Sequence, residues 1–154
     1  MDLPEIVMQF SEEMARHFTE DKIAFVRRMG LKAVTLEPGH VKLLVPLAGN
    51  ENHIGTMYAG ALFTLAEIPG GALFITSFDT RRFYPIIKDM SLRFRRPAKG
   101  DISVEARIGA EEIERIQAEA SANGKADYLL ELDLVDATGE VVAQSRGLYQ
   151  LRAH

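Results

Sequence analysis

The segment from Asn52 to Phe78 constrains the fold of this chain more than any other, because it is long, apolar and almost uncharged. Between Glu51 and Asp79 the only formal charge is that of Glu67. A helix that is apolar over most of its surface has to be buried against other elements. A bare carboxylate within such a helix is costly to bury, so Glu67 must be paired, hydrogen-bonded or kept for chemistry.

The apolar segment is expected to form a long helix that begins near Thr56, whose hydroxyl could cap it by accepting a backbone N–H. Four residues at spacings of four, three and four share one small, polar face, which a ligand or a second copy of the helix could approach closely. These residues are Gly60, Thr64, Glu67 and Gly71. The opposite, apolar side should lie on a sheet. It carries Leu62, Phe63, Ala66, Leu73 and Phe74.

Pro69 interrupts this helix, because proline cannot donate a hydrogen bond to the carbonyl of Leu65. We expect a kink or an early end of the helix there, at a cost of about 3 kcal/mol if nothing compensates. The freed carbonyl is close to Glu67 and could hold a water molecule. Equally, the sequence Pro69-Gly70-Gly71 could serve only to bend the helix around a sheet.

The rest of the chain predicts short helices and alternating strands. Two helices are expected at the start, over residues 4–19 and 20–29, and the second ends at Gly30. The apolar positions of the first are Ile6, Val7, Phe10, Met14 and Phe18. Strands over 31–37 and 41–47 flank the turn pair Pro38-Gly39. Strands over 85–96, 102–108, around 130–134 and over 141–151 follow, with a helix over 111–122 among them, so we predict an α+β fold.

Length and composition narrow the class of protein. A chain of 154 residues corresponds to one domain, and a net charge of -4 gives no basis for nucleic-acid binding. The absence of cysteine excludes disulfides and thiolate chemistry. The histidines are not paired at metal-ligand spacing, so we expect no metal site. The absence of a Gly-x-Ser-x-Gly motif argues against a serine hydrolase. Without a signal-peptide pattern or an uninterrupted membrane-spanning run, we expect a cytoplasmic protein with no membrane partner.

The helix carries the motif Asn52-x-x-Gly55-Thr56-x-x-x-Gly60-x-x-x-x-Leu65-Ala66-Glu67, and Phe94-Arg95-Arg96-Pro97-Ala98-Lys99-Gly100-Asp101, Asp136-x-x-Gly139 and Gly147-x-Tyr149-x-Leu151 follow it. Together with the order of elements, these motifs resemble the hot-dog fold of the thioesterase superfamily, in which an antiparallel sheet wraps around one long central helix. The resemblance covers residues 31–154 as the hot-dog core, with residues 1–30 as an N-terminal helical extension of the same domain. It is nearest to the phenylacetate-pathway-type acyl-CoA thioesterases, in a branch of small bacterial thioesterase-like proteins.

Matched to that family residue by residue, Gly60 corresponds to the last glycine of a Gly-x-x-His-Gly-Gly-like helix start. Glu67 corresponds to the acidic residue later in the helix, where aspartate is commoner. The chain departs from the family at Tyr58, which replaces the histidine, and at Ala59, which replaces a glycine. The helix expected over 111–122 also replaces a plain strand.

The resemblance implies hydrolysis of an acyl-CoA thioester, with catalytic roles for Glu67, Gly60 and Ala59. The unpaired amides of Ala59 and Gly60 at the helix start could hold the thioester oxygen. Glu67 would act as general base on water or attack the carbonyl directly, and both alternatives stay open. Gly60 and Glu67 are seven residues apart, which is about 10 Å along one helix. The two groups should therefore come from two antiparallel helices, in a homodimer or a tetramer with composite sites.

Substrate contacts are expected from the loop before the helix, from the helix itself and from a strand end. These residues are Asn52, His53, Gly55, Thr56, Tyr58 and Thr64, together with Arg95, Arg96 and Lys99, which could meet the phosphates of coenzyme A. No cofactor is expected beyond the coenzyme A of the substrate.

Each role has an alternative. A helical carboxylate is more often an ion-pair partner, surface basic residues are often only solvated, and Tyr58 could be a packing residue. Two other functions also stay open. One is a hot-dog dehydratase or hydratase, for which His53 is the only evident partner of Glu67. The other is a non-catalytic acyl-CoA or lipid-binding module, in which Glu67→Ala would leave binding unchanged.

Overall fold

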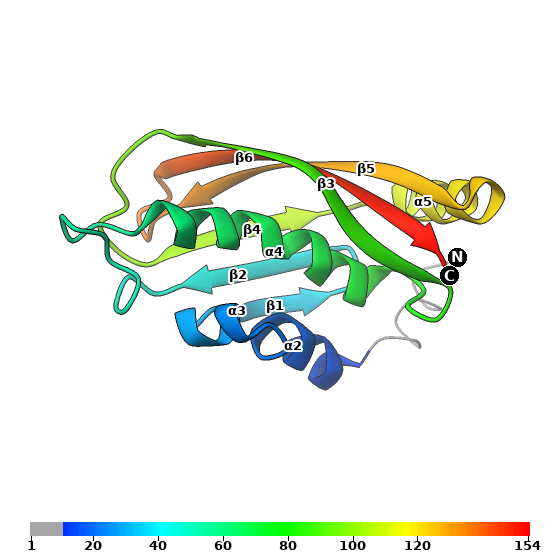
Figure 1. The fold of residues 1–154 in the computed structure, drawn as a ribbon, viewed down its shortest axis with the longest axis horizontal. Helices are drawn as coiled ribbons and strands as arrows, with labels where there is room; N and C mark the ends of the chain where they lie inside the picture. Colours follow the sequence, from blue (N-terminus) through cyan, green and yellow to red (C-terminus); the bar gives the residue numbers. More distant parts are fainter. Residues whose placement is uncertain (1–10) are drawn as a thin grey trace.

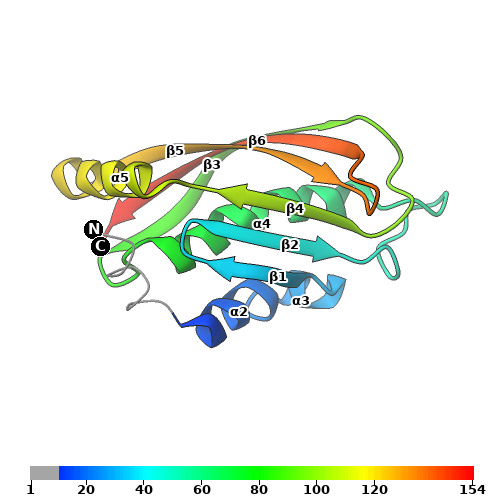
Figure 2. The ribbon, with the colours of Figure 1, turned by 180° about the vertical axis from the view of Figure 1, so that it is seen from behind.

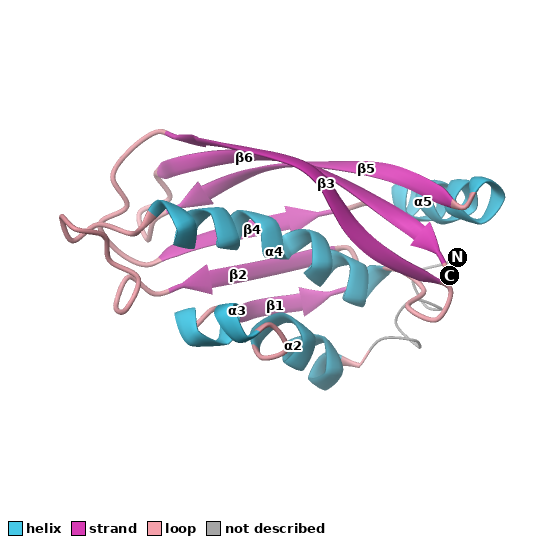
Figure 3. Ribbon diagram, in the orientation of Figure 1, coloured by secondary structure: helices cyan, strands magenta, loops and turns pink. Residues whose placement is uncertain are grey.

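The computed structural model describes residues 11–154, and its centre is a six-stranded sheet packed around one long helix (Figure 1). All neighbouring strands are antiparallel, in the order β1-β2-β4-β5-β6-β3. The strands are β1 (Lys32–Glu37), β2 (His40–Val45), β3 (Phe83–Phe94), β4 (Ile102–Arg107), β5 (Lys125–Val135) and β6 (Val141–Ala153). The helices are α2 (Glu12–Glu20), α3 (Ala24–Met29), α4 (Ala59–Ser77) and α5 (Ala110–Asn123). The predicted α+β fold is confirmed (Figure 3).

Local sequence accounts for the turns and for two helix ends. Gly39 has a φ of 77°, a conformation that the turn between β1 and β2 requires and that residues with a side chain rarely adopt. The carboxylate of Asp136 accepts two backbone N–H groups within the turn between β5 and β6. Gly30 and Gly124 end α3 and α5 in the left-handed conformation. The predicted hairpin, and the predicted ends of these two helices, are confirmed.

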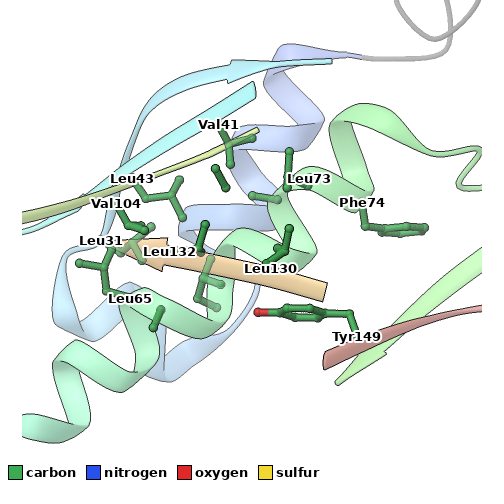
Figure 4. Close-up of a cluster of buried hydrophobic side chains, with 14 of the residues drawn as sticks. Leu31, Val41, Leu43, Leu65, Leu73, Phe74, Val104, Leu130, Leu132 and Tyr149 are labelled. Carbon is green, nitrogen blue, oxygen red and sulfur yellow. The ribbon is translucent and has the colours of Figure 1, made fainter. Parts of the chain in front are cut away.

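Helix α4 lies against the sheet with its apolar side, and the contact forms the hydrophobic core (Figure 4). From α4 the core includes Leu62, Leu65, Ala66, Leu73 and Phe74, and from the sheet Val41, Leu43, Val104, Leu130 and Leu132. Phe63 is 43% exposed, so the prediction that it faces the sheet is wrong. It lies one turn before Glu67, on the outer face of the helix. Among residues 11–154, α4 is the one helix long and apolar enough to cross a membrane, and most of it is buried in the fold.

Helix α4 begins later than predicted. Its first residue is Ala59, Tyr58 occupies the N-cap position, and no side chain from the described part of the chain caps the helix. The predicted cap at Thr56 is wrong, because Asn52 holds that residue in the preceding loop. The side-chain amide of Asn52 donates to the Thr56 hydroxyl (2.8 Å), and its oxygen accepts the Thr56 N–H (3.1 Å). Asparagine thus offers this backbone an alternative to the helix.

Pro69 does not end α4, which continues to Ser77, so the predicted alternative of an early helix end is wrong. The turn around it is supported from outside. The hydroxyl of Tyr149, on β6, donates to the backbone carbonyl of Glu67 (2.9 Å).

The two edges of the sheet differ. At β1, Arg16 of α2 donates to the carbonyl of Ala33 (2.7 Å), and Glu20 of α2 accepts the Ala33 N–H (2.8 Å). These side chains satisfy backbone groups that a bare edge would expose. At the other edge, β3 is paired with β6 alone among the strands of residues 11–154. One edge is therefore covered by α2, and the other is open to a partner.

The N-terminal helices depart from their predicted positions. Met14 is 68% exposed, so its predicted place on the buried face is wrong, and α2 instead buries Ala15 and Thr19. The reason is the contact with β1. Arg16 and Glu20 bond the backbone of this strand, and this turns their neighbours Ala15 and Thr19 toward the sheet edge. Helix α3 begins at Ala24, later than expected. The other apolar positions predicted for the first helix, before residue 11, lie outside the described residues.

Candidate active site

The outer face of α4, turned away from the sheet, carries the predicted site residues. Gly60, Thr64 and Glu67 follow one another along it and are partly exposed in a single chain. Gly71 continues this row but lies beside α2, where an added Cβ would be 3.5 Å from the ring of Phe18. The hydroxyl of Thr64 donates to the carbonyl of Gly60 (2.8 Å) and so turns back onto its own helix. The open part of the face is the N-terminal half of α4.

Glu67 is half-buried on the outer face of α4. Its carboxylate forms no hydrogen bond or ion pair with the residues from 11 to 154. Burial without a partner disfavours the charged form and raises the pKa of Glu67 above the usual value for glutamate. A structural ion pair within this part of the chain is therefore not the role of Glu67, and its carboxylate is free to act on another molecule.

The first turn of α4 presents two adjacent free amides. The N–H groups of Ala61 and Leu62 both donate to the carbonyl of Tyr58 (3.0 and 3.2 Å). The N–H groups of Ala59 and Gly60 have no acceptor in the described part of the chain. With no side-chain cap, the partial positive charge of the helix start is uncompensated there. Amides placed in this way can hold a carbonyl oxygen that gains negative charge.

Tyr58 lies over this helix start. A Cβ added to Gly60 would be 2.5 Å from the Cε2 atom of the Tyr58 ring. The missing side chain of Gly60 therefore lets the ring rest on the first turn of α4, beside the free amides. The Tyr58 side chain is exposed at this point, so it borders the outer face of the helix.

The loop before α4 is organised by Asn52, whose side chain makes three hydrogen bonds within it, to Ile54 and Thr56. Gly55 completes the loop with a φ of 87°. Asn52 and Thr56 are thus engaged in shaping the loop, whereas His53 is exposed on its surface. Since Glu67 has no hydrogen-bond or ion-pair partner among residues 11–154, a His53–Glu67 pair is absent from the single chain.

The three basic residues after β3 do not converge on one point. The guanidinium of Arg95 donates to the side chain of Gln144 (2.8 Å) on the face of the sheet away from α4. Arg96 is paired with Glu140 (3.2 Å) and, with Lys99, lines a hollow of about 410 Å³ beside the turn between β5 and β6.

That turn region lies at the same end of the fold as the start of α4. The N–H of Met57 donates to the carbonyl of Ala98 (2.8 Å), which joins the loop before α4 to the turn after β3. Arg96 and Lys99 flank Ala98 in the sequence. Of the three predicted phosphate contacts, these two are therefore nearer to the helix start than Arg95.

A larger hollow, of about 1110 Å³, lies on the face of the sheet away from α4. This face of the sheet is in front in Figure 2. Ser103 and Glu105 of β4 line it, whereas Val104 between them is buried toward the helix. Because strand residues alternate between the two faces, the sheet separates this hollow from Glu67. Its size does not make it the candidate site, since the free amides and the unpaired carboxylate are on the other side. Among the described residues no group of three or more histidines and carboxylates could hold a metal ion.

Tyr149 is the residue at this site that the sequence did not identify as functional. It is 82 positions from Glu67, whose carbonyl it bonds, so no spacing rule connects them. The available signal was Gly70, a glycine inside a helix, where alanine would be more stable by about 1 kcal/mol. A glycine retained at such a position indicates that something packs closely against it.

The antiparallel sheet, its central helix and the acidic residue midway along that helix define a hot-dog fold protein of the thioesterase-like class. The chain belongs to the family described as "Domain of unknown function (DUF4442)", whose sequence pattern matches residues 12–149.

Solved structures agree with this assignment. PA5026 from Pseudomonas aeruginosa, described as a probable thioesterase, is 68% identical, with 96% of this chain and 99% of that chain covered and a TM-score of 0.92. The thioesterase HI1161 from Haemophilus influenzae is 13% identical, with 94% and 92% covered and a TM-score of 0.71. A variant of the thioesterase SAV0944 from Staphylococcus aureus is 16% identical, with 84% and 99% covered and a TM-score of 0.66. The last two show the fold alone. No protein of curated function matches the chain significantly.

Proposed function

We propose that this protein hydrolyses thioesters and that its substrates are acyl-CoAs. The observation that carries the proposal is the half-buried carboxylate of Glu67, which lies on the same helix face as the amides of Ala59 and Gly60 and, like them, has no partner among residues 11–154. The similarity to PA5026, described as a probable thioesterase, supports the type of reaction.

In the proposed reaction the amides of Ala59 and Gly60 stabilise the thioester oxygen as it becomes negative. Glu67 takes a proton from a water molecule, whose oxygen attacks the carbonyl carbon. The C–S bond then breaks, and Glu67 returns the proton to the departing thiolate, which leaves as the thiol. The raised pKa of Glu67 makes it a stronger base than an exposed glutamate. Direct attack by Glu67, with hydrolysis of the resulting anhydride, is the alternative. Coenzyme A enters as part of the substrate, and no resident cofactor takes part.

Two chains are needed to assemble this site. Within one α4, the Gly60 amide and Glu67 are about 10 Å apart along the axis, too far to act on one carbonyl group. Two α4 helices that pack antiparallel about a two-fold axis would bring Gly60 of one chain beside Glu67 of the other. We therefore propose a homodimer with two composite sites, either alone or as half of a tetramer.

The surface of the single chain supports this dimer. Large apolar side chains are exposed at the start of α4, where they are Tyr58 and Phe63. Others are exposed along β3, where they are Tyr84, Ile87 and Phe94. A second copy packed along α4 and β3 would bury these side chains. The free edge of β3 also offers unpaired backbone groups to a second copy, whereas α2 already covers the β1 edge.

Substrate contacts complete the proposal. We assign the coenzyme A phosphates to Arg96 and Lys99 in the first place, because the Met57–Ala98 hydrogen bond brings their turn to the helix start. Arg95 lies farther away, beside Gln144. Tyr58 and Thr64 border the acyl group, and the enzyme would act in the cytoplasm.

Release of free thiol from short, long and aromatic acyl-CoAs tests the reaction. Wild-type protein should release thiol from at least one class, and Glu67→Ala should lower turnover by about two orders of magnitude or more. Glu119→Ala is the control, since it removes a surface carboxylate of α5 that is paired with Arg115. If the wild type binds acyl-CoA but releases no thiol from any of them, the protein is a binding module and the proposal is wrong.

The oxyanion role has its own test in Ala59→Pro. Proline at the first helical position removes one N–H and is well tolerated there. The preceding Tyr58 has a φ of -61° and a ψ of 139°, the extended conformation that a following proline requires. Turnover should fall about 10²- to 10³-fold. Ala110→Pro, at the first position of α5 after the extended Gly109, is the matched control and should leave turnover unchanged.

A further inference from the structure

Tyr149 of β6 joins the sheet to the turn of α4 that carries Glu67. Its hydroxyl donates to the Glu67 carbonyl over 2.9 Å. Figure 4 shows the ring extending from β6 toward α4, beside Leu130. The backbone of Glu67 is thus held from the sheet as well as by the helix.

The Tyr149 ring is fixed in a slot that two glycines provide. A Cβ on Gly70 of α4 would be 2.0 Å from the ring, and a Cβ on Gly147 of β6 would be 2.8 Å from it. Tyr128 of β5 stacks on the ring, with centroids 5.4 Å apart and an angle of 16° between the planes. The ring is therefore confined by both elements, and its hydroxyl has little freedom to leave the Glu67 carbonyl.

The turn of α4 around Glu67 needs such support. Pro69 has no N–H, so the carbonyl of Leu65 lacks its helical donor. Gly70 and Gly71 follow directly and add backbone freedom. The Glu67 carboxylate itself has no hydrogen bond or ion pair within residues 11–154. Its position therefore depends on its backbone, and the backbone is bonded to Tyr149.

We propose that Tyr149 is a positioning residue, whose hydrogen bond to the Glu67 carbonyl holds the carboxylate in place for the reaction. The catalytic part of this inference rests on the proposed thioesterase function, whereas the anchoring of Glu67 does not. Burial, together with the nearby charge of Glu67, raises the pKa of Tyr149, so the phenol remains a donor at neutral pH. Tyr149 is the titratable group of the described chain that interacts with Glu67, and Tyr128 is the next phenol beyond it.

Two conservative variants separate this role from simple packing. Tyr149→Phe keeps the ring and removes the bonded hydroxyl. Tyr128→Phe keeps its ring and removes a buried hydroxyl that has no hydrogen-bond partner among residues 11–154. We expect Tyr149→Phe to lower kcat about tenfold, the equivalent of one lost buried hydrogen bond, with KM within about twofold. Its acidic limb of kcat against pH should move to lower pH, because a loosened Glu67 gains water. Tyr128→Phe should change neither.

A second measurement does not depend on turnover. With ¹³C-labelled glutamate, the carboxyl resonance of Glu67 can be titrated by NMR in both variants and in the wild type. A lower pKa of Glu67 in Tyr149→Phe alone supports the anchoring, even if the wild type hydrolyses no thioester and the proposed function fails. An unchanged kcat and an unchanged Glu67 pKa in Tyr149→Phe overturn the inference. Equal losses in both variants also overturn it, since they would reflect packing of the aromatic cluster.

Discussion

Two neighbouring glycines of α4 should respond in opposite directions to the same substitution. Inside a helix, alanine is more stable than glycine by about 1 kcal/mol, so Gly70→Ala and Gly71→Ala begin with the same gain. At Gly71 the added Cβ would be 3.5 Å from the Phe18 ring, an ordinary contact. At Gly70 it would be 2.0 and 2.3 Å from two ring atoms of Tyr149, closer than any real contact.

The Tyr149 ring cannot move aside without loss, because it stacks on Tyr128 and its hydroxyl is bonded to Glu67. Overpacking costs about 1–3 kcal/mol, and the lost hydrogen bond about 1 kcal/mol more. We therefore expect Gly71→Ala to stabilise the protein by about 0.5–1 kcal/mol and Gly70→Ala to destabilise it by about 2 kcal/mol. In a chain of this size the Tm should rise by about 2 °C in the first variant and fall by about 4–8 °C in the second.

Thermal and urea unfolding measure both changes. The matched background is Tyr149→Leu, which removes the ring. In that background Gly70→Ala should stabilise the protein by about 1 kcal/mol, the helix-propensity gain alone, so the double-mutant cycle should give a coupling of about 3 kcal/mol. Equal Tm shifts for the two glycine variants, or no coupling between Gly70 and Tyr149, would refute the reasoning.

Three further changes have expected outcomes. Glu67→Gln should raise the Tm at pH 8 but not below about pH 4. Burial raises the pKa of Glu67 in the folded state, so ionisation of its carboxyl group destabilises the fold as the pH rises from about 4 to 8. A Tm difference between variant and wild type that is constant across pH would contradict this. Ile87→Lys, at the free β3 edge, should shift the protein toward monomer in sedimentation experiments, whereas Leu129→Lys should not, although the two side chains are similarly exposed (38% and 42%). Glu20→Ala leaves the Ala33 N–H of β1 without its partner and should cost about 1–3 kcal/mol of unfolding free energy. Glu12→Ala removes only an exposed ion pair and should cost less than about 0.5 kcal/mol. Equal costs of the two variants in urea unfolding would count against the role of α2 at the sheet edge.

The sequence predicted the features whose causes are local. Proline and glycine set the hairpin turn at residues 38–39, and glycine ends α3 and α5 at Gly30 and Gly124. Alternation of apolar and polar residues identified β4 and β5, since their burial alternates in the same way. The face of α4 that carries Gly60 and Glu67 followed from helical spacing alone.

The features that the sequence did not predict have distant or competing causes. Thr56 was assigned as the helix cap because threonine commonly caps helices. The hydrogen bonds from Asn52 instead hold it in the loop, and residue spacing does not show which of these two arrangements prevails. Phe63 was placed in the core because an apolar residue on the helix was assumed to face the sheet, yet it lies on the outer face. The contact of Tyr149 with Gly70 and Glu67 joins β6 to α4 across the fold, so only the folded structure reveals it.

Complementation between two inactive variants tests the composite site most directly. Ala59→Pro lacks an amide at the helix start, and Glu67→Ala lacks the carboxylate, so each homodimer should release thiol from acyl-CoA at a small fraction of the wild-type rate. Co-expressed with different affinity tags and purified as a heterodimer, they should form one intact site out of two and recover about half of the wild-type turnover. A heterodimer as inactive as both parents would show that each site lies within one chain, and would contradict this account.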